Sequence, residues 1–366
     1  MKVYSAINVF RLLTLVCVLM CGRALPAGEP LPYSNSPPMS EVIIVEDPRA
    51  IDAFKPRLEI VRSMVNRALI GLTATTSTTQ AWRSLVATQD IVGIKVFSSP
   101  GPNSGTRAAV VAPLIEGLLS AGLPSDHIII WDRQITDLRL AGFSDLARRY
   151  KVRLAGATQE GFDEKVFYEA PLLGNLVWGD LEFGRKGDGI GRKSFVTRLL
   201  TRKITKIINV NPLLNHNSAG VCGNLFSLAM SSVDNIVRFE SDPERLATAV
   251  PEIYAVTNLS ERVVLNVVDA LICQYEGGER ALLHYSSPLN QVRMSRDPVA
   301  LDMLSLKELD RQRRAAQAPE VKPNIELYNN ATLLELGQSN LQRIKIDFVT
   351  NSPGSDRGYS AQARSH

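Results

Sequence analysis

Cysteine is scarce in this chain, which has four cysteines among 366 residues. Cys17 and Cys21 fall within the first 24 residues, so only Cys222 and Cys273 remain in the rest of the chain. Two thiolates cannot complete a four-cysteine zinc site or hold an iron–sulfur cluster, so a cluster in this chain is not expected. The two remaining cysteines, which lie in apolar sequence, either form one disulfide in an oxidising compartment or stay as buried free thiols.

The N-terminal apolar run is also too short to be a membrane anchor. It extends from Leu12 to Met20, about nine residues, whereas a helix needs roughly 20 to cross a bilayer. Basic residues precede this run, and Gly-Arg-Ala at 22–24 places small residues where signal peptidase cuts. We therefore predict a signal peptide at residues 1–24 and export to the periplasm or the extracellular space. A lipoprotein acylated at Cys21 is the alternative, although the methionine before it fits poorly.

Net charge is small once this leader is set aside. The formal charge of the whole chain is +4, and Lys2, Arg11 and Arg23 supply three of these charges, which leaves about +1. The basic excess therefore belongs to the targeting segment, and nucleic acid is not an expected partner. A hydrophobic content of 45% with 21% charged residues is typical of a globular protein with a large core.

Common catalytic motifs are missing as well. The sequence has no nucleophile elbow, no Walker loop, no His-Glu-x-x-His motif and no cysteine-based redox pair. A glycine-rich segment occurs at 184–193, but no apolar strand leads directly into it and no helix follows it. It therefore fails as a dinucleotide-binding fingerprint, and we interpret it as a mobile hairpin loop.

The sequence does contain an alternation of short β-branched runs and helical patterns. Such alternation predicts an α/β fold with a mainly parallel sheet and helices on both faces. The predicted domain spans 41–349, with a β-rich antiparallel insertion at 164–203. A Pro/Ser-rich linker at 25–40 precedes it, and a disordered tail at 351–366 follows it. The main elements we expect are strands at 41–45, 91–97, 127–131, 204–210, 262–268 and 343–349, and helices at 58–72, 108–121, 218–231, 242–258, 298–314 and 330–336.

Polar residues follow several of the predicted buried strands. Asp132, Asn211 and Asp269 stand at the ends of three of them, and Asp297 precedes the last long helix. Ligands of open α/β sheets bind at the carboxyl ends of the strands, so these groups predict a small-molecule site at one sheet edge. The candidate substrate-binding residues are Asp132, Asn211, Asn215, Asn217, Asn224 and Asp297.

Lys95 and His216 are the first two candidate catalytic residues. A lysine in a strand buried on both faces must be paired or have a lowered pKa, and it could bind an anion or act as a base. In an edge strand, Lys95 would instead extend to water. His216 lies at a predicted strand-to-helix turn, where a helix N-terminus binds anions and lowers the pKa of an imidazole. There it would act as an acid/base, unless it only caps the helix or packs beneath it.

Asp269 and Asp302 complete the catalytic candidates. Asp302 falls on the buried face of its predicted helix, where a carboxylate needs a partner, for which Lys95, Arg296 or a metal could serve. Asp269 and Asp302 could together form an oxygen-rich site for a divalent cation, although their spacing does not demand one. Asp297 has a structural alternative, because Asp-Pro at a helix start is a typical N-cap.

Several of these segments resemble the domain-of-unknown-function 362 (DUF-362) family. The matching segments are VGIKV at 92–96, NVNPLLNHNSAGVCGNL at 209–225, SRDPVALD at 295–302 and the closing helix and strand. The resemblance covers most of 41–349 and includes Lys95, His216, Asn224, Asp269, Asp297 and Asp302.

The resemblance implies an α/β fold but no reaction, because the family is named for its missing function. Some relatives are linked to ferredoxin-type iron–sulfur modules, but this chain lacks the cysteines, so that cofactor is not carried over. Relatives often have a lysine shortly before the histidine, where this chain has Asn215. That difference weakens an anion-binding role for this loop.

Two functions follow from the sequence. The first is an exported enzyme acting on a small anionic or carbonyl substrate. In it Lys95 and the helix start after His216 would hold negative charge, His216 would serve as acid/base, and Asp269 or Asp302 would orient a partner or a cation. The second is a non-catalytic periplasmic binding or assembly protein that uses the same crevice or the insertion at 164–203. A structural domain with a decayed site is a third possibility, and the oligomeric state is open.

Overall fold

The computed structural model describes residues 39–240, 242–256 and 259–350. The predicted leader, the predicted tail and nearly all of the predicted linker lie outside these residues. Within the part of the chain described here, no helix is both long and apolar enough to cross a membrane.

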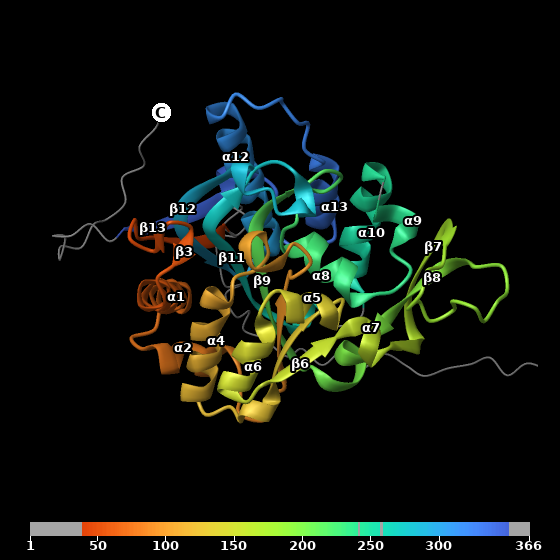
Figure 1. Ribbon diagram of the computed structural model, residues 1–366, viewed down its shortest axis with the longest axis horizontal. Helices are drawn as coiled ribbons and strands as arrows, with labels where there is room; N and C mark the ends of the chain where they lie inside the picture. Colours follow the sequence, from red (N-terminus) through yellow and green to blue (C-terminus); the bar gives the residue numbers. More distant parts are fainter. Residues whose placement is uncertain (1–38, 241, 257–258, 351–366) are drawn as a thin grey trace, which may run out of the picture. The chain divides into compact units, whose positions relative to one another are not determined.

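A sheet of nine strands organises the fold (Figure 1). Its order is β13-β1-β12-β11-β9-β4-β5-β6, and the short β10 pairs with β9. The run from β11 to β6 is parallel, whereas β12 is antiparallel to both of its neighbours. The predicted mainly parallel sheet is therefore confirmed. The strands are β1 (Ser40–Glu46), β4 (Val92–Val96), β5 (Ile128–Asp132), β6 (Arg153–Gly156), β9 (Lys206–His216), β10 (Gly220–Val221), β11 (Val263–Gln274), β12 (Ser286–Ser295) and β13 (Ile344–Thr350).

Helices cover both faces of this sheet, which explains why its central strands are mostly apolar. Alternate residues of each strand point to opposite faces, so Ile130 joins one hydrophobic core and Trp131 the other. One core is closed by α1 (Leu58–Thr73), α2 (Thr78–Leu85), α4 (Ala108–Ser120) and α6 (Phe143–Tyr150). The other is closed by α8 (Asn224–Ser232), α10 (Pro243–Ala255), α12 (Pro298–Ala315) and α13 (Ile325–Leu333).

Short elements connect these layers. They are β2 (Ile51–Asp52), β3 (Lys55–Pro56), α3 (Gly101–Ser104), α5 (Ile135–Leu140), α7 (Ala157–Glu160), α9 (Val237–Glu240), α11 (Leu259–Arg262), the π-helix η2 (Leu199–Lys203) and the 3-10 turns η1 (Ser125–His127), η3 (Gly278–Arg280), η4 (Leu283–Tyr285) and η5 (Leu341–Arg343). Cys222 and Cys273 are both buried free thiols, so of the two states expected for them the structure has the unbridged one.

The order of strand addition reverses between β4 and β9. After β4 the chain adds β5 and β6 on one side, and it later adds β9 and β11 on the other. Ligands of doubly wound sheets bind at such a switch point, at the carboxyl ends of the strands. Lys95 of β4 lies between Trp131 and Asn209 of the two neighbouring strands. It is therefore in a central strand, and the edge-strand alternative is wrong.

The predicted insertion contains an antiparallel hairpin that is separate from the main sheet. It consists of β7 (Phe162–Asn175) and β8 (Ile190–Thr197) and lies at the right of Figure 1. The glycine-rich segment covers the connection between these strands and the start of β8. Gly184, Gly187 and Gly189 have positive φ angles, which glycine adopts without strain. The segment is therefore a hairpin connection, as its context predicts.

The segment around His216 differs from the prediction. The expected helix at 218–231 begins only at Asn224, because β9 continues to His216 and turns back into β10. Gly220 makes this hairpin possible with a φ of +91°, and the hydroxyl of Tyr328 donates a hydrogen bond to the carbonyl of Ala219. Contacts from α13, distant in sequence, thus stabilise a strand pair where local sequence favours a helix start. Similarly, β11 runs on to Gln274, so Asp269 lies inside that strand.

Candidate functional site

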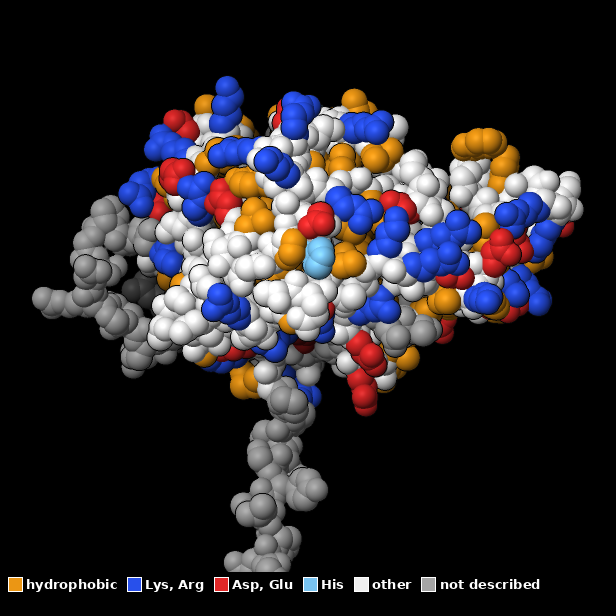
Figure 2. All heavy atoms as spheres, turned by 90° about the horizontal axis from the view of Figure 1, so that it is seen from below, with side chains coloured by type: hydrophobic (Ala, Val, Ile, Leu, Met, Phe, Trp, Pro, Cys, Tyr) orange, Lys and Arg blue, Asp and Glu red, His pale blue; other side chains and the backbone are white. Residues whose placement is uncertain are grey.

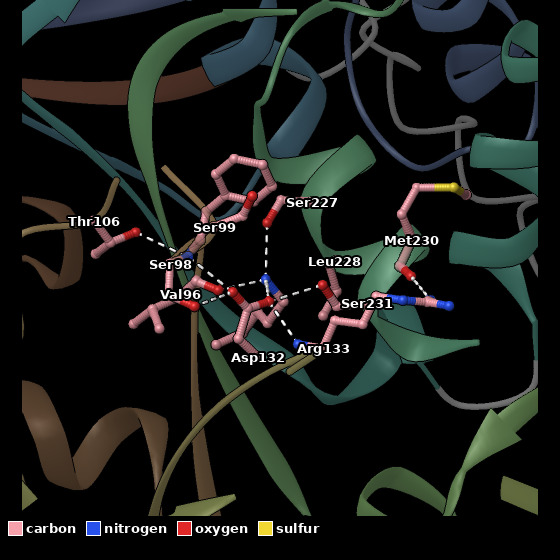
Figure 3. A network of polar contacts seen from close by, with 12 residues as sticks. Val96, Ser98, Ser99, Thr106, Asp132, Arg133, Ser227, Leu228, Met230 and Ser231 are labelled. Atoms are coloured by element: carbon pink, nitrogen blue, oxygen red, sulfur yellow. Dashed lines mark hydrogen bonds and ion pairs between the residues drawn. The ribbon is translucent and has the colours of Figure 1, made fainter. Parts of the chain in front are cut away.

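Lys95 and Asp132 form a buried ion pair at the carboxyl ends of β4 and β5. Figure 3 shows Asp132 with Ser98, Ser227 and Ser231 around it. Lys95 Nζ lies 2.9 Å from Asp132 Oδ1, and the two side chains are 0% and 5% exposed. The ammonium also donates to the carbonyl of Val96 and, at 2.9 Å, to the hydroxyl of Ser227 on α8. All three ammonium donors are thus used, so the buried lysine is paired as its position requires.

The carboxylate of Asp132 is equally well satisfied. Its Oδ2 accepts from the backbone N–H of Ser98 at 2.8 Å and from the Ser98 hydroxyl at 2.7 Å. Its Oδ1 accepts from the hydroxyl of Ser231 and from the backbone N–H of Arg133. Burial raises the pKa of Asp132, but Lys95 and Ser98 outweigh it and hold that pKa below its usual value. These hydrogen bonds and the Lys95 ammonium together offset the desolvation of the carboxylate.

Hydrogen bonds join the η3 turn to the loop after β4 and to the end of β9. The hydroxyl of Ser99, just after β4, donates a 2.8 Å hydrogen bond to Glu279 in η3. The side-chain oxygen of Asn215, near the end of β9, accepts a 2.9 Å bond from the backbone N–H of Gly278. Burial, followed by the charge of neighbouring carboxylates, raises the pKa of Glu279. Burial lowers the pKa of Lys95, and the negative charges of Asp132 and, to a smaller extent, Glu279 oppose that shift.

Three buried asparagines link β9 to α8. Asn211 Nδ2 donates to Oδ1 of Asn209 at 2.9 Å and to Oδ1 of Asn224 at 3.2 Å. Asn209 Nδ2 donates to the carbonyl of Asn224 at 2.9 Å. The structure therefore brings Asn211 and Asn224 together as one polar network, in which Asn211 Oδ1 has no partner among the described residues.

Asp302 caps the N-terminus of α8. Its Oδ1 accepts from the backbone N–H of Asn224 at 2.6 Å, and its Oδ2 accepts from the next backbone N–H at 3.0 Å. Gly223 permits this approach, because a Cβ there would lie 2.2 Å from Asp302 Oδ1. The expectation that Lys95 or Arg296 would pair with this carboxylate is wrong, because the helix start supplies the donors instead.

Asp269 pairs with Arg107. Arg107 Nη1 lies 3.0 Å from Asp269 Oδ1, and the backbone N–H of Arg107 donates to Oδ2 at 2.9 Å. Because Arg107 directly precedes α4, Asp269 ties β11 to the start of that helix. The part of the chain that the structure describes contains no group of three or more His, Cys, Asp or Glu side chains that could hold a metal. The cation site considered for Asp269 and Asp302 therefore gains no support.

His216 ends β9 rather than preceding a helix. Its Nδ1 accepts from the backbone N–H groups of Ser218 and Ala219, at 3.2 and 3.0 Å. Its ring packs on Phe226 with centroids 4.2 Å apart. Burial lowers the pKa of His216 to about 4. The imidazole is therefore neutral at neutral pH and serves as an acceptor within the β9–β10 turn, packed against α8. The expected position of His216 at a helix start is wrong, and its acid/base role stays a prediction.

The remaining candidates do not contact the ion pair. Asn215 Nδ2 reaches Oδ1 of Asn217 at 3.5 Å. Asp297 caps α12, because its Oδ1 accepts from the backbone N–H of Ala300 at 2.9 Å. Its Oδ2 accepts from the backbone N–H of Gln338 at 2.8 Å. The N-cap interpretation of Asp297 is thus confirmed.

Sequence reasoning missed several partners of the site residues, namely Ser98, Ser227, Ser231, Glu279 and Arg107. Ser227 and Ser231 are four residues apart on α8 and so lie on one face of that helix. Hydroxyls at this spacing in an otherwise apolar helix are the pattern that could have identified them. The position of Glu279 near the ion pair depends on the path of a loop, which no local pattern predicts.

The comparisons with known proteins concern this region of the chain. The family model described as a domain of unknown function, DUF362, matches residues 92–307, which run from β4 into α12. A solved structure of a protein from Thermotoga maritima is 12% identical, with a TM-score of 0.41 over 73% of this chain and 61% of that chain. The chain thus spans about 61% of the length of that protein. No curated protein matches the chain.

Proposed function

The chain belongs to the DUF362 family, and we propose that it is an exported enzyme that acts on a small carbonyl compound at the carboxyl edge of its sheet. The observation that carries the proposal is the buried ion pair of Lys95 and Asp132 at the switch point between β4 and β9. Withdrawing two charges from water is costly, and proteins concentrate such pairs at functional sites. The position at strand ends is where ligands of this fold class bind.

Charge balance favours a carbonyl substrate over an anionic one. Asp132 neutralises Lys95 one to one, and Glu279 adds further acidic character near the pair. A substrate anion would have to compete with both carboxylates for a single ammonium. A carbonyl oxygen needs only a hydrogen-bond donor, which the Ser227 hydroxyl can supply while it accepts from the Lys95 ammonium.

The proposed chemistry is proton transfer to and from the substrate. Burial lowers the pKa of Lys95, which brings the ammonium closer to the range of a useful acid. The Ser227 hydroxyl, 2.9 Å from Lys95 Nζ, can pass a proton between that nitrogen and a bound molecule. Asp132 would hold the Lys95 side chain in position and stabilise its ammonium form.

A cavity of about 240 Å³ lies beside the start of α4, and neither Lys95 nor Ser227 is among the residues that line it. It lies between the β4–α4 connection and the far end of β11, and it is lined by Lys55, Pro102, Asn103, Arg107, Ile272 and Leu283, among others. Lys55 and Asn103 add polar groups beside an apolar wall, whereas the Arg107 guanidinium is bonded to Asp269 and to the carbonyl of Asn103.

Replacing Ser227 with alanine tests this function without removing either charge. Hydroxyacetone and other small neutral carbonyl compounds are expected to raise the melting temperature of the wild-type chain, whereas acetate and phosphate are not. Loss of one hydrogen bond should weaken carbonyl binding about tenfold in Ser227→Ala. Ser232→Ala is the matched control, because its hydroxyl bonds the Leu228 carbonyl on the same helix.

Equal carbonyl binding by Ser227→Ala and the wild type would contradict the assignment to this site. A stronger response to acetate and phosphate would contradict the preference for carbonyl compounds. Binding without any change in the compound, followed by NMR over time, would instead support the non-catalytic binding protein.

Export is proposed on the predicted leader at 1–24. N-terminal sequencing of the protein recovered from the periplasmic or extracellular fraction should give a chain that begins near Leu25, and a chain that keeps Met1 would contradict cleavage. Figure 2 shows one face of the molecule, on which Lys and Arg side chains lie among apolar and acidic ones.

A further inference from the structure

The strand β13 occupies one edge of the main sheet. Among the described residues it pairs only with β1, in parallel, over Ile344–Thr350. Its outer edge therefore presents backbone N–H and C=O groups without strand partners, which is a template for pairing with another chain. The opposite edge strand, β6, is only four residues long, whereas β13 has seven.

One face of this edge is apolar and exposed. Ile346 and Phe348 are 41% and 50% exposed, although they alternate with polar residues as a half-buried strand should. With Ile44 and Leu304 they form the apolar part of a groove of about 480 Å³ between the sheet edge and α12, whose other lining residues are polar or charged. Exposed apolar residues along a free strand edge are characteristic of an interface.

The other face of the edge carries two opposite charges. Lys345 Nζ lies 2.9 Å from Asp347 Oδ2 and 2.8 Å from Glu41 Oε1. Lys345 and Asp347 are separated by one residue, so both point to the same side of the strand, away from Ile346. The strand thus carries the Lys345–Asp347 ion pair on one face and the apolar side chains of Ile346 and Phe348 on the other.

We propose that β13 pairs antiparallel with β13 of a second copy of this chain. Two copies joined in this way are related by a two-fold axis perpendicular to the sheet, so one residue faces its own copy across the axis. With Ile346 on the axis, Lys345 faces Asp347 of the second copy, and Asp347 faces the second Lys345. On the other face, Ile344 lies opposite Phe348 of the second copy, so apolar side chains meet across the strands.

Neighbouring registers are less favourable. An axis at Lys345 places two lysines directly opposite each other, and an axis at Asp347 does the same with two aspartates. Like charges directly opposite on an antiparallel pair are destabilising. The register with Ile346 on the axis therefore pairs both charges with their opposites, and this self-complementarity identifies a second copy as the occupant of this edge.

Charge reversal provides the test, with the mass of the full chain measured by sedimentation equilibrium over a concentration series. The wild type is expected to form a dimer. Lys345→Glu and Asp347→Lys each place like charges opposite one another twice per dimer, so each should raise the dissociation constant about tenfold or more. An equimolar mixture of the two variants should recover near-wild-type association, because every cross-strand pair is again opposite in sign.

The matched control is Arg148→Glu, which reverses one charge of an exposed ion pair with Asp145 on α6. It should associate like the wild type. A register test is Ile346→Cys, which should give a disulfide-linked dimer on mild oxidation, whereas Phe348→Cys should not. A monomeric wild type at every concentration, or a mixture that dissociates like the separate variants, would overturn the proposal.

Discussion

Replacing Lys95 with methionine is expected to lower the free energy of unfolding by about 3–5 kcal/mol, because it leaves Asp132 as an uncompensated buried charge. The side chain of Asp132 is 5% exposed, so water cannot replace the lost ammonium without opening the sheet edge. Urea unfolding at neutral pH, followed by circular dichroism, measures this loss.

The double variant Lys95→Met, Asp132→Asn separates charge from packing. Removing the second charge should restore a large part of the lost stability, because the cost in the single variant lies mainly in the unpaired carboxylate. Arg148→Met, which removes an exposed cation on α6, should change stability by less than about 0.5 kcal/mol. Equal stability losses in the single and double variants would show that the charge pairing contributes little.

Replacing Asp302 with alanine is expected to cost about 3 kcal/mol or more, because it leaves three buried donors without an acceptor. These are the backbone N–H of Asn224, its side-chain amide, and the backbone N–H of Leu225. Unfolding should begin with the start of α8, so hydrogen exchange at those two amides should accelerate before the rest of the sheet exchanges. Similar exchange rates of the Asn224 and Leu225 amides in the wild type and in Asp302→Ala would contradict the capping role.

The same residue predicts a pH dependence. Burial raises the pKa of Asp302 to about 7, from 3.8 in the unfolded chain. Folding therefore favours its protonated form, and that contribution is complete below pH 3.8 and lost as the pH rises towards 7. Between pH 5 and pH 8 the wild type should lose about 2–3 kcal/mol more stability than Asp302→Asn, which cannot titrate. Parallel pH profiles for the two proteins would contradict this.

The parallel sheet could be predicted from sequence because its buried strands are short, apolar and β-branched. Lys95 was identified for the same reason, since a charge within such a strand requires a partner. Its partner could not be identified, because Asp132 reaches Lys95 only through the side-by-side placement of β4 and β5. Local sequence carries no information on which strands are neighbours.

For His216, the prediction of the local structure was wrong. The residues after it predict a turn into a helix, and the helix exists, but it begins only at Asn224. Between them the chain forms a hairpin stabilised by Tyr328, more than a hundred residues away. A tertiary contact thus decides the local structure, and with it the chemistry available to the imidazole.

The helix α8 makes contacts at two points along its length, and the number of residues between them is fixed. Its first turn is fixed by Asp302, while Ser227 and Ser231 further along it contact Lys95 and Asp132. A shift of α8 by one residue would move every group by about 1.5 Å along the axis, enough to break hydrogen bonds at both ends. The length of α8 therefore fixes the distance between its contact with Asp302 of α12 and its contacts with Lys95 and Asp132 at the strand ends. An insertion or deletion within 223–231 should be incompatible with both ends at once, whereas the hairpin connection at 184–189 can change length freely.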